Sequence, residues 1–192
     1  MKKIIFSITF IFFIACQGTK YEWFLGSLDE AKAIAGSKLI MLKFYTNTWG
    51  ACIRLDVETL RNPQVQDFSR LNFISLKFNA NEDVGYDYFK QYKCQGVPHL
   101  VFLDADGIEV DRIIGFLPPS EYLLRIKDIA NKKNTLNDFL ARYEKGERNS
   151  EIIAAIAMKY EDRKNSEKAA EFYSILINEY ADEESDYNEQ GK

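Results

Sequence analysis

Few side chains in this sequence could carry thiol, acid–base or metal chemistry. Three cysteines and one histidine occur among the 192 residues, at Cys16, Cys52, Cys94 and His99. Cysteine acts as a nucleophile through its thiolate, and histidine is the side chain that changes charge most readily near neutral pH. A single structural zinc site would need all four of these residues, so we do not expect a zinc cluster. We therefore expect thiol chemistry, with no metal site and no cofactor.

The composition limits the kind of protein that carries these thiols. Hydrophobic residues make up 46% of the chain and charged residues 28%, which is ordinary for a folded protein and excludes wholesale disorder. The length suits one domain with a small appendage. The net charge is −4. Because the chain has no basic excess to neutralise phosphates, we expect no nucleic-acid partner.

The N-terminus has the layout of a secretory signal peptide over residues 1–15. Lys2 and Lys3 form a positive region, and residues 4–14 form an apolar run that is too short to span a bilayer comfortably as a helix. Cys16 follows directly, in a position that resembles the lipobox of bacterial lipoproteins. An ordinary signal peptide followed by a coincidental cysteine is the alternative.

Lipidation of Cys16 would anchor the protein to a membrane. We therefore expect a lipid-anchored, extracytoplasmic protein of the bacterial cell envelope, on the periplasmic side or at the surface, where disulfides can persist. Residues 16–26 would form a tether, and the acidic residues 182–192 would form a frayed tail.

Helical and strand patterns alternate through the first two thirds of the chain. Ser27 and Glu30 form a capping box that starts a helix ending at Gly36. Apolar periodicity and turn residues predict further helices over residues 50–61, 64–70, 84–92 and 118–130, and strands over residues 39–45, 73–78, 99–103 and 108–114. This alternation predicts an α/β fold in which helices cover both faces of a sheet.

The last third of the chain has no strand pattern. Helices are predicted over residues 135–145, 151–163 and 166–180, and the last two resemble a tetratricopeptide-type hairpin. The predicted apolar faces of this hairpin contain Ile152, Ile153, Ile156, Ala157 and Tyr160, and Ala169, Ala170, Tyr173, Leu176 and Ile177. A single repeat cannot bury both faces, so we expect the extension over residues 135–181 to pack on the preceding domain or on a partner.

Three segments, in order along the chain, carry a resemblance to a known family. They are FYTNTWGACIRLDVETL at residues 44–60, the NPQVQDF that follows, and GVPHLVFLDADGIEVDRIIGF at residues 96–116. The pattern resembles the thioredoxin superfamily, with the closest likeness to the thioredoxin-like domain of bacterial envelope thiol:disulfide interchange proteins. The resemblance covers residues 27–131 and implies a thioredoxin-like fold with protein or peptide partners. It also implies that Pro98 follows a cis peptide bond and faces the redox cysteines.

The family's Trp-Cys-x-x-Cys motif is incomplete in this chain. The aligned residues are Trp49, Gly50, Ala51 and Cys52, so Trp49 stands where the nucleophilic cysteine is expected and Cys52 is the second cysteine. The family's cycle needs one thiolate to attack and a second thiol to resolve the mixed disulfide. With Cys52 alone, the standard dithiol cycle cannot close locally.

Three roles for this incomplete site stay open. Cys52 could act as a monothiol that forms mixed disulfides. Cys94 could resolve such a disulfide if the two Cα atoms lie within about 7 Å, or Cys94 could be a small core residue. In the third role, redox chemistry is lost and the fold binds peptides by strand addition beside Val97 and Pro98. Thiol–disulfide handling through Cys52 is our first hypothesis, and a non-catalytic peptide-binding or chaperone-like module is the alternative.

Three residues near this site each have two interpretations. Trp49 is expected to be exposed at a helix tip, as a binding anchor or as a cap on the local core. His99 could act as a base beside Cys52, although a lone histidine in a strand more often packs or faces solvent. Lys43 stands where thioredoxins place a buried carboxylate, and we expect its aliphatic stem to carry the ammonium group to the surface.

Overall fold

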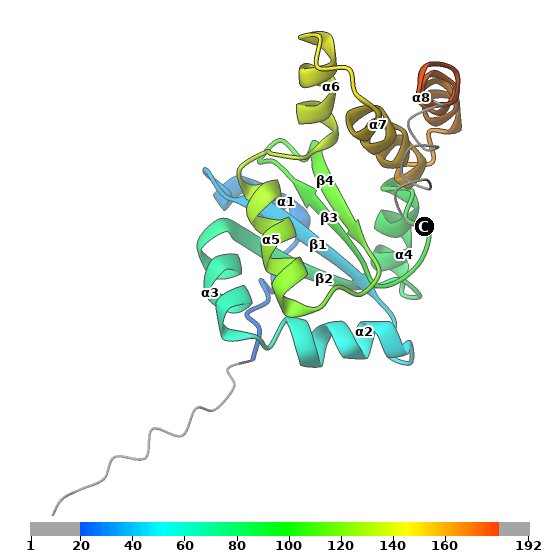
Figure 1. The fold of residues 1–192 in the computed structure, drawn as a ribbon. Helices are drawn as coiled ribbons and strands as arrows, with labels where there is room; N and C mark the ends of the chain where they lie inside the picture. The colour runs from blue at the N-terminus through cyan, green and yellow to red at the C-terminus, as the bar shows by residue number, and fades with distance from the viewer. Residues whose placement is uncertain (1–19, 181–192) are drawn as a thin grey trace, which may run out of the picture.

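The computed structural model describes residues 20–180, and its centre is a four-stranded sheet (Figure 1). The strand order is β2-β1-β3-β4, with β1 at Leu39–Tyr45, β2 at Phe73–Asn79, β3 at His99–Leu103 and β4 at Glu109–Ile114. β1 is parallel to β2 and antiparallel to β3, and β4 is antiparallel to β3. The predicted signal peptide, Cys16 and the acidic tail lie outside the described residues.

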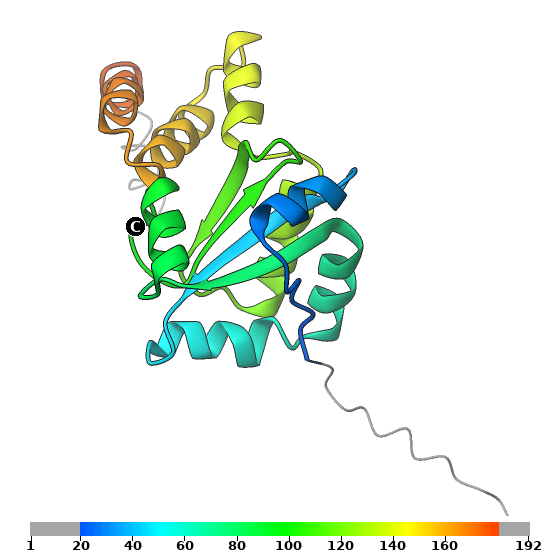
Figure 2. The same ribbon diagram turned by 180° about the vertical axis from the view of Figure 1, so that it is seen from behind.

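Helices cover both faces of the sheet, so the predicted α/β class is confirmed. Figure 1 shows α3 (Pro63–Asn72) and α5 (Pro119–Ala130) in front of the sheet, and Figure 2 shows α1 (Leu28–Ile34) and α4 (Asp83–Gln91) on the opposite face. Alternate residues of β1 divide between the two cores. Met41 packs in the core under α3 and α5, whereas Leu42 packs in the core under α1 and α4.

The helix that leads into β1 begins as its sequence predicts. The side chain of Ser27 accepts a hydrogen bond from the Glu30 backbone at 3.2 Å, and the Glu30 carboxylate accepts one from the Ser27 backbone at 2.7 Å. This reciprocal capping box satisfies two of the free N–H groups at the start of α1.

The predicted helix over residues 50–61 is not one regular helix. α2 (Gly50–Arg54) passes directly into a π-helical turn, η1 (Leu55–Thr59). The wider turn buries Thr59, whose hydroxyl donates to the Leu117 carbonyl at 2.6 Å. Periodicity over a single turn does not distinguish the two kinds of helix, and contacts with the loop before α5 select the wider one.

The turn between β3 and β4 is stabilised by Asp104. Its carboxylate accepts hydrogen bonds from the backbone N–H groups of Asp106 at 3.1 Å and Ile108 at 2.8 Å. Gly107 follows with a positive φ of 84°, a conformation that side-chain-bearing residues rarely adopt. The acidic residues of this turn therefore stabilise a β-hairpin.

Three helices complete the described chain: α6 (Leu136–Glu144), α7 (Ser150–Asp162) and α8 (Ser166–Glu179). The predicted helical hairpin, α7 with α8, is confirmed, and Ile152, Ile153, Ile156 and Ala157 are buried as predicted. The predicted face of α8 was partly wrong, because Ala170 and Ile177 are exposed. Phe172 is buried instead, with its ring 5.4 Å from that of Tyr143 in α6 and 5.9 Å from that of Tyr160 in α7, so packing against the neighbouring helices sets which face turns inward.

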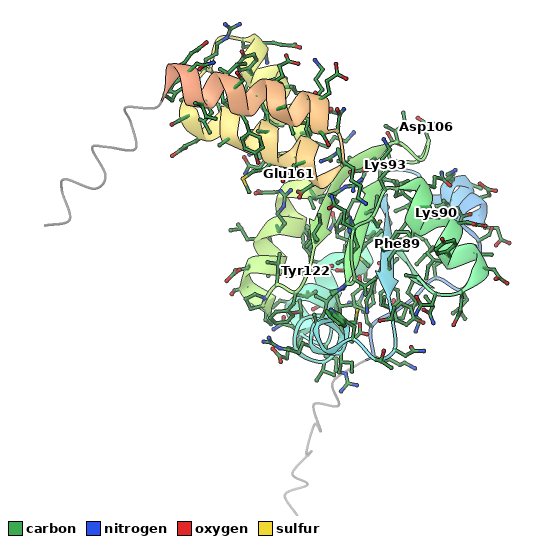
Figure 3. All side chains as sticks on the ribbon, turned by 90° about the vertical axis from the view of Figure 1, so that its right-hand side faces the viewer. Phe89, Lys90, Lys93, Asp106, Tyr122 and Glu161 are labelled. Atoms are coloured by element: carbon green, nitrogen blue, oxygen red, sulfur yellow. The ribbon has the colours of Figure 1, made fainter. Side chains whose placement is uncertain are left out.

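The helical hairpin docks on the sheet through a group of charged residues that we call the Asp111 cluster. Its members come from β4, α5, α7 and the loop after α7, and they are Glu109, Asp111, Arg112, Arg125, Lys159 and Arg163. Figure 3 shows the lower end of the hairpin, marked by Glu161, beside the loop that carries Lys93. The helical extension therefore packs on the preceding domain, which was one of the two predicted arrangements.

Two further observations concern the described residues alone. Within residues 20–180, no helix has the length and apolar character needed to cross a bilayer. The same part of the chain contains no group of three or more cysteine, histidine, aspartate or glutamate side chains placed to hold a metal ion.

Candidate functional site

Cys52 lies in the first turn of α2, three residues after Trp49, which is the N-cap residue of that helix. Its side chain is buried, with 1% of its surface exposed. Burial raises the pKa of the thiol, although the backbone of Thr46 and the positive charge of Lys43 act in the opposite direction. Because the thiolate is the reactive form, the raised pKa disfavours nucleophilic attack by Cys52.

Lys43, in the middle of β1, does not reach the surface as the sequence interpretation expected. Its side chain is 1% exposed, and its ammonium group forms an ion pair with Asp56 of η1. Burial lowers the pKa of Lys43, and the hydrogen bond and charge of Asp56 oppose that shift. The aliphatic stem cannot carry the charge outward because η1 brings a carboxylate over the strand, so the charge is neutralised within the structure.

Trp49 is the residue that the motif alignment puts at the expected position of the nucleophilic cysteine, and it is the N-cap of α2. It is 58% exposed, as the sequence predicts. Its side chain makes no capping hydrogen bond to the backbone of α2. A large exposed aromatic ring at the tip of a helix offers contact area and no redox chemistry.

Cys94 is buried on the other face of the sheet from Lys43 and Asp56. It belongs to the core under α1 and α4, whereas the residues of β1 that share a face with Lys43 belong to the core under α3 and α5. Burial raises the pKa of Cys94 to about 12. Both described cysteines are free thiols, and the charged groups that act on Cys94 differ from those that act on Cys52.

The loop before β3 contains a cis peptide bond between Val97 and Pro98, as the family resemblance implies. Pro98 is buried, and its carbonyl accepts a hydrogen bond from the Gly115 N–H at 2.9 Å. Val97 is partly exposed, and its backbone makes no hydrogen bond to any residue in the described range. An exposed backbone without a partner can pair with an extended chain.

His99 is fully buried at the start of β3. Neither ring nitrogen makes a well-formed hydrogen bond within residues 20–180. Burial lowers the pKa of His99 to about 3, and the positive charges of Arg112 and Arg163 contribute in the same direction. The side chain therefore stays neutral, and it faces the Asp111 cluster rather than the charges around Cys52.

Sequence reasoning missed Asp56 and Thr46 as neighbours of Cys52. Asp56 lies four residues after Cys52 on a predicted helix, and this spacing places both residues on one face. Nothing in the sequence distinguishes Thr46, because its backbone, and not its side chain, interacts with the thiol.

Comparison with protein families and known proteins gives one consistent answer. The model of a thioredoxin-like domain matches residues 27–130. The thiol:disulfide interchange protein DsbD of Tatumella citrea is 26% identical over 108 residues, which cover 55% of this chain and 19% of that protein. The thioredoxin-like protein HCF164, chloroplastic, of Oryza sativa subsp. japonica is 25% identical over 123 residues, covering 64% of this chain and 42% of that protein. The chain thus spans less than half the length of these curated relatives.

Solved structures show the same fold. A thioredoxin from Thermus thermophilus superimposes with a TM-score of 0.51 and 22% identity, covering 58% of this chain and 88% of that one. A DsbH oxidoreductase superimposes with a TM-score of 0.50 and 24% identity, covering 59% of this chain and 86% of that one. The matched fraction leaves a large part of this chain outside both of these thioredoxin folds.

Proposed function

Because the chain belongs to the thioredoxin-like domain family, we propose that it is an extracytoplasmic protein that binds extended peptide or protein partners and has no dithiol cycle of its own. The contact residues are Trp49, Val97 and Pro98. The relatives named as thiol:disulfide interchange proteins connect this binding to disulfide handling in the envelope. The proposal includes a chaperone-like action of this protein on its bound partner.

One observation carries the proposal. At the position where the family has its attacking thiol, this chain presents exposed Trp49, and the remaining motif thiol, Cys52, is buried with a raised pKa. The backbone of Val97 is open for pairing, as strand addition requires. An exposed aromatic side chain and an open backbone each suit binding better than catalysis.

Site-specific photo-crosslinking in cells tests the binding surface. A photoreactive residue at position 49 or 97 is expected to capture partners, whereas the same residue at position 124 is not. Leu124 of α5 is the matched control, because it is 66% exposed and Trp49 is 58% exposed. Equal capture at positions 49 and 124 would count against a binding site at the tip of α2.

Thiol–disulfide handling through Cys52 is the second candidate function. Two features favour it: the backbone of Thr46 and the charge of Lys43 both stabilise the thiolate. Cys52 would act as a monothiol, since Cys94 lies in a different core with a pKa of about 12. Mass measurement of native protein after incubation in glutathione redox buffers tests this function. A stable adduct at Cys52, absent from Cys52→Ser, would support it over the binding proposal.

We also propose that Cys16 is lipidated and that the protein is anchored in the bacterial envelope. The apolar run before Cys16 supports this proposal. Metabolic labelling with a fatty acid is expected to mark the protein, and Cys16→Ser is expected to abolish the label. Labelling that persists in Cys16→Ser would contradict lipidation at this residue.

A further inference from the structure

A hollow of about 200 Å³ lies beside η1 and the N-terminal segment of the described chain. We call it the Lys43 pocket, and its lining residues are Lys20, Tyr21, Trp23, Lys43, Tyr45, Asp56, Leu60, Arg61 and Lys77. Four of these side chains are cationic, and Asp56 is the one carboxylate. This excess of positive charge is unusual for a chain whose net charge is −4.

The sheet itself places two of these cations together. Lys43 of β1 and Lys77 of β2 are direct register partners, so their side chains project from the same face. The ammonium group of Lys43 lies 5.5 Å from the centre of the Trp23 ring and 5.4 Å from that of Tyr45. The ammonium group of Lys77 lies 5.7 Å and 5.8 Å from the same two rings. Like charges directly opposite on neighbouring strands destabilise a sheet.

The carboxylate in the pocket neutralises one cation of the four. Asp56 pairs with Lys43, whereas Lys20, Arg61 and Lys77 form no ion pair with any residue from 20 to 180. The aromatic rings offset part of the repulsion between Lys43 and Lys77. An anion bound between the lysines and Arg61 would offset the remaining repulsion, because it would accept hydrogen bonds from several cationic groups at once.

We propose that the Lys43 pocket binds a phosphate group, either as the headgroup of an anionic phospholipid or as a free phosphate. A phosphate carries up to two charges and several acceptor oxygens, and arginine and lysine are its usual partners. The pocket is below the size of ordinary drug-like sites, so it suits a small headgroup rather than a large ligand. The site is separate from Trp49 and Val97 and does not depend on the proposed partner binding.

The position of the pocket along the chain makes a membrane a natural source of phosphate. Lys20, which lines the pocket, is four residues after Cys16. Four extended residues span at most about 14 Å. If Cys16 carries the proposed lipid, the pocket must stay close to the headgroup layer.

Tryptophan fluorescence of the full chain, purified in detergent, gives a direct test. The protein has two tryptophans, so Trp49→Phe leaves Trp23 of the pocket as the sole reporter. Inorganic phosphate is expected to change the Trp23 emission saturably, beyond the effect of sodium chloride at equal ionic strength. Lys77→Gln in this background should raise the midpoint roughly tenfold, as expected for one lost charge-assisted bond.

Lys90→Gln is the matched control. Lys90, labelled on α4 in Figure 3, is also an exposed lysine over an aromatic ring, 4.8 Å from the centre of Tyr86. The Lys90→Gln variant is expected to keep the phosphate midpoint within about twofold of the value without this substitution. Arg61→Gln provides a second variant from a different element, in case Lys77→Gln disturbs β2. The proposal is overturned if phosphate gives no saturable change, or if Lys77→Gln and Arg61→Gln behave like Lys90→Gln.

Vesicles distinguish the two sources of phosphate. Binding to phosphatidylglycerol vesicles is compared with binding to phosphatidylcholine vesicles, since any lipid anchor contributes equally to both. A preference for phosphatidylglycerol that Lys77→Gln removes and Lys90→Gln retains assigns the pocket to phospholipid. Phosphate binding that requires Lys77, without such a preference, assigns it to free phosphate.

Discussion

Two buried charges in this protein are treated in opposite ways. Asp111, fully buried in β4, is surrounded by Arg125, by Lys159 with hydrogen bonds of 2.8 Å and 3.1 Å, and by Arg163 at 3.2 Å. Lys43, equally buried in β1, has one carboxylate partner and lies next to Lys77, its register partner on the adjacent strand β2. Three cations therefore surround the single negative charge of Asp111. Lys43 has one carboxylate partner and lies in a pocket that holds further unpaired cations.

The difference separates a structural charge from one available for binding. Each cation around Asp111 comes from a different part of the chain, α5, α7 or the loop after α7, so the cluster fixes the helical hairpin on the sheet. Arg112 reinforces the junction by donating to the carbonyls of Asp162 at 2.8 Å and Tyr92 at 3.1 Å. Around Lys43 the excess charge is left for a ligand, so stability and function should respond differently to mutation at the two sites.

Removal of the Asp111 charge is expected to have the largest effect. Asp111→Asn leaves three cations near a neutral side chain, and loss of one partner from a buried ion cluster costs about 3–5 kcal/mol. Urea unfolding measures the change. The exposed pair of Asp67 and Arg70 provides the control, and Asp67→Asn should change stability little. Similar losses in both variants would mean that the Asp111 cluster does not fix the hairpin.

The second expected effect is a loss of folding stability at acidic pH that depends on His99. Its folded pKa of about 3 lies below the ordinary 6.5, so the unfolded chain binds more protons between these values. The stability contributed by neutral His99 is full above pH 6.5 and is lost as the pH falls toward 3, and the loss at pH 4 is roughly 3 kcal/mol.

His99→Leu removes this titration and tests it directly. Urea unfolding at pH 7 and pH 4 should show a smaller loss of stability in the variant than in the natural protein. The residual acid sensitivity of His99→Leu should come from Asp111, whose pKa is lowered by the charges of Lys159 and Arg125 against the effect of burial. Identical pH profiles would show that His99 is not held neutral in the fold.

A smaller effect is expected when the Lys43 charge is removed. Lys43→Met keeps a stem of similar length, ends the repulsion with Lys77, and leaves Asp56 half exposed and able to hydrate. We expect a change within about 1 kcal/mol in either direction, measured by the same unfolding experiment. A loss as large as that of Asp111→Asn would make Lys43 a structural charge and remove the contrast between the two sites.

The smallest expected effect is on the reactivity of Cys52. Lys43 lowers the pKa of this thiol and Asp56 raises it. Lys43→Met should therefore move the pH profile of Cys52 alkylation upward, and Asp56→Asn should move it downward, by less than about one unit each. Rates are measured by mass spectrometry in a Cys94→Ser background. Shifts in the same direction in both variants would contradict the electrostatic link between the pocket and the thiol.

Much of the fold could be predicted from the sequence because the signals are local. The capping box of Ser27 and Glu30 and the apolar run of β1 each act within a few residues, and each forms as predicted. The face of α8 was less predictable. Phe172 turns inward against Tyr143 of α6 and Tyr160 of α7, and Ala170 and Ile177 turn outward, because the neighbouring helices pack on that side of α8.

The candidate site was predictable as a set of positions and less so as chemistry. Trp49, Cys52, Val97 and Pro98 follow from motif spacing. The environment of each depends on segments far away in the sequence: η1 brings Asp56 to Lys43, and the hairpin brings Arg163 toward His99. Burial and charge set a pKa, and both come from those distant segments.

The sequence by itself determined the α/β class and the few residues that could carry thiol chemistry, because these are properties of residue type and order. Only the tertiary structure decided that Cys52 and Cys94 lie in different environments, that Lys43 is buried opposite Lys77, and that Asp111 binds the hairpin to the sheet. The physical reason is that strand pairing and helix docking bring together charges separated by tens of residues, and local patterns do not record which of them will meet.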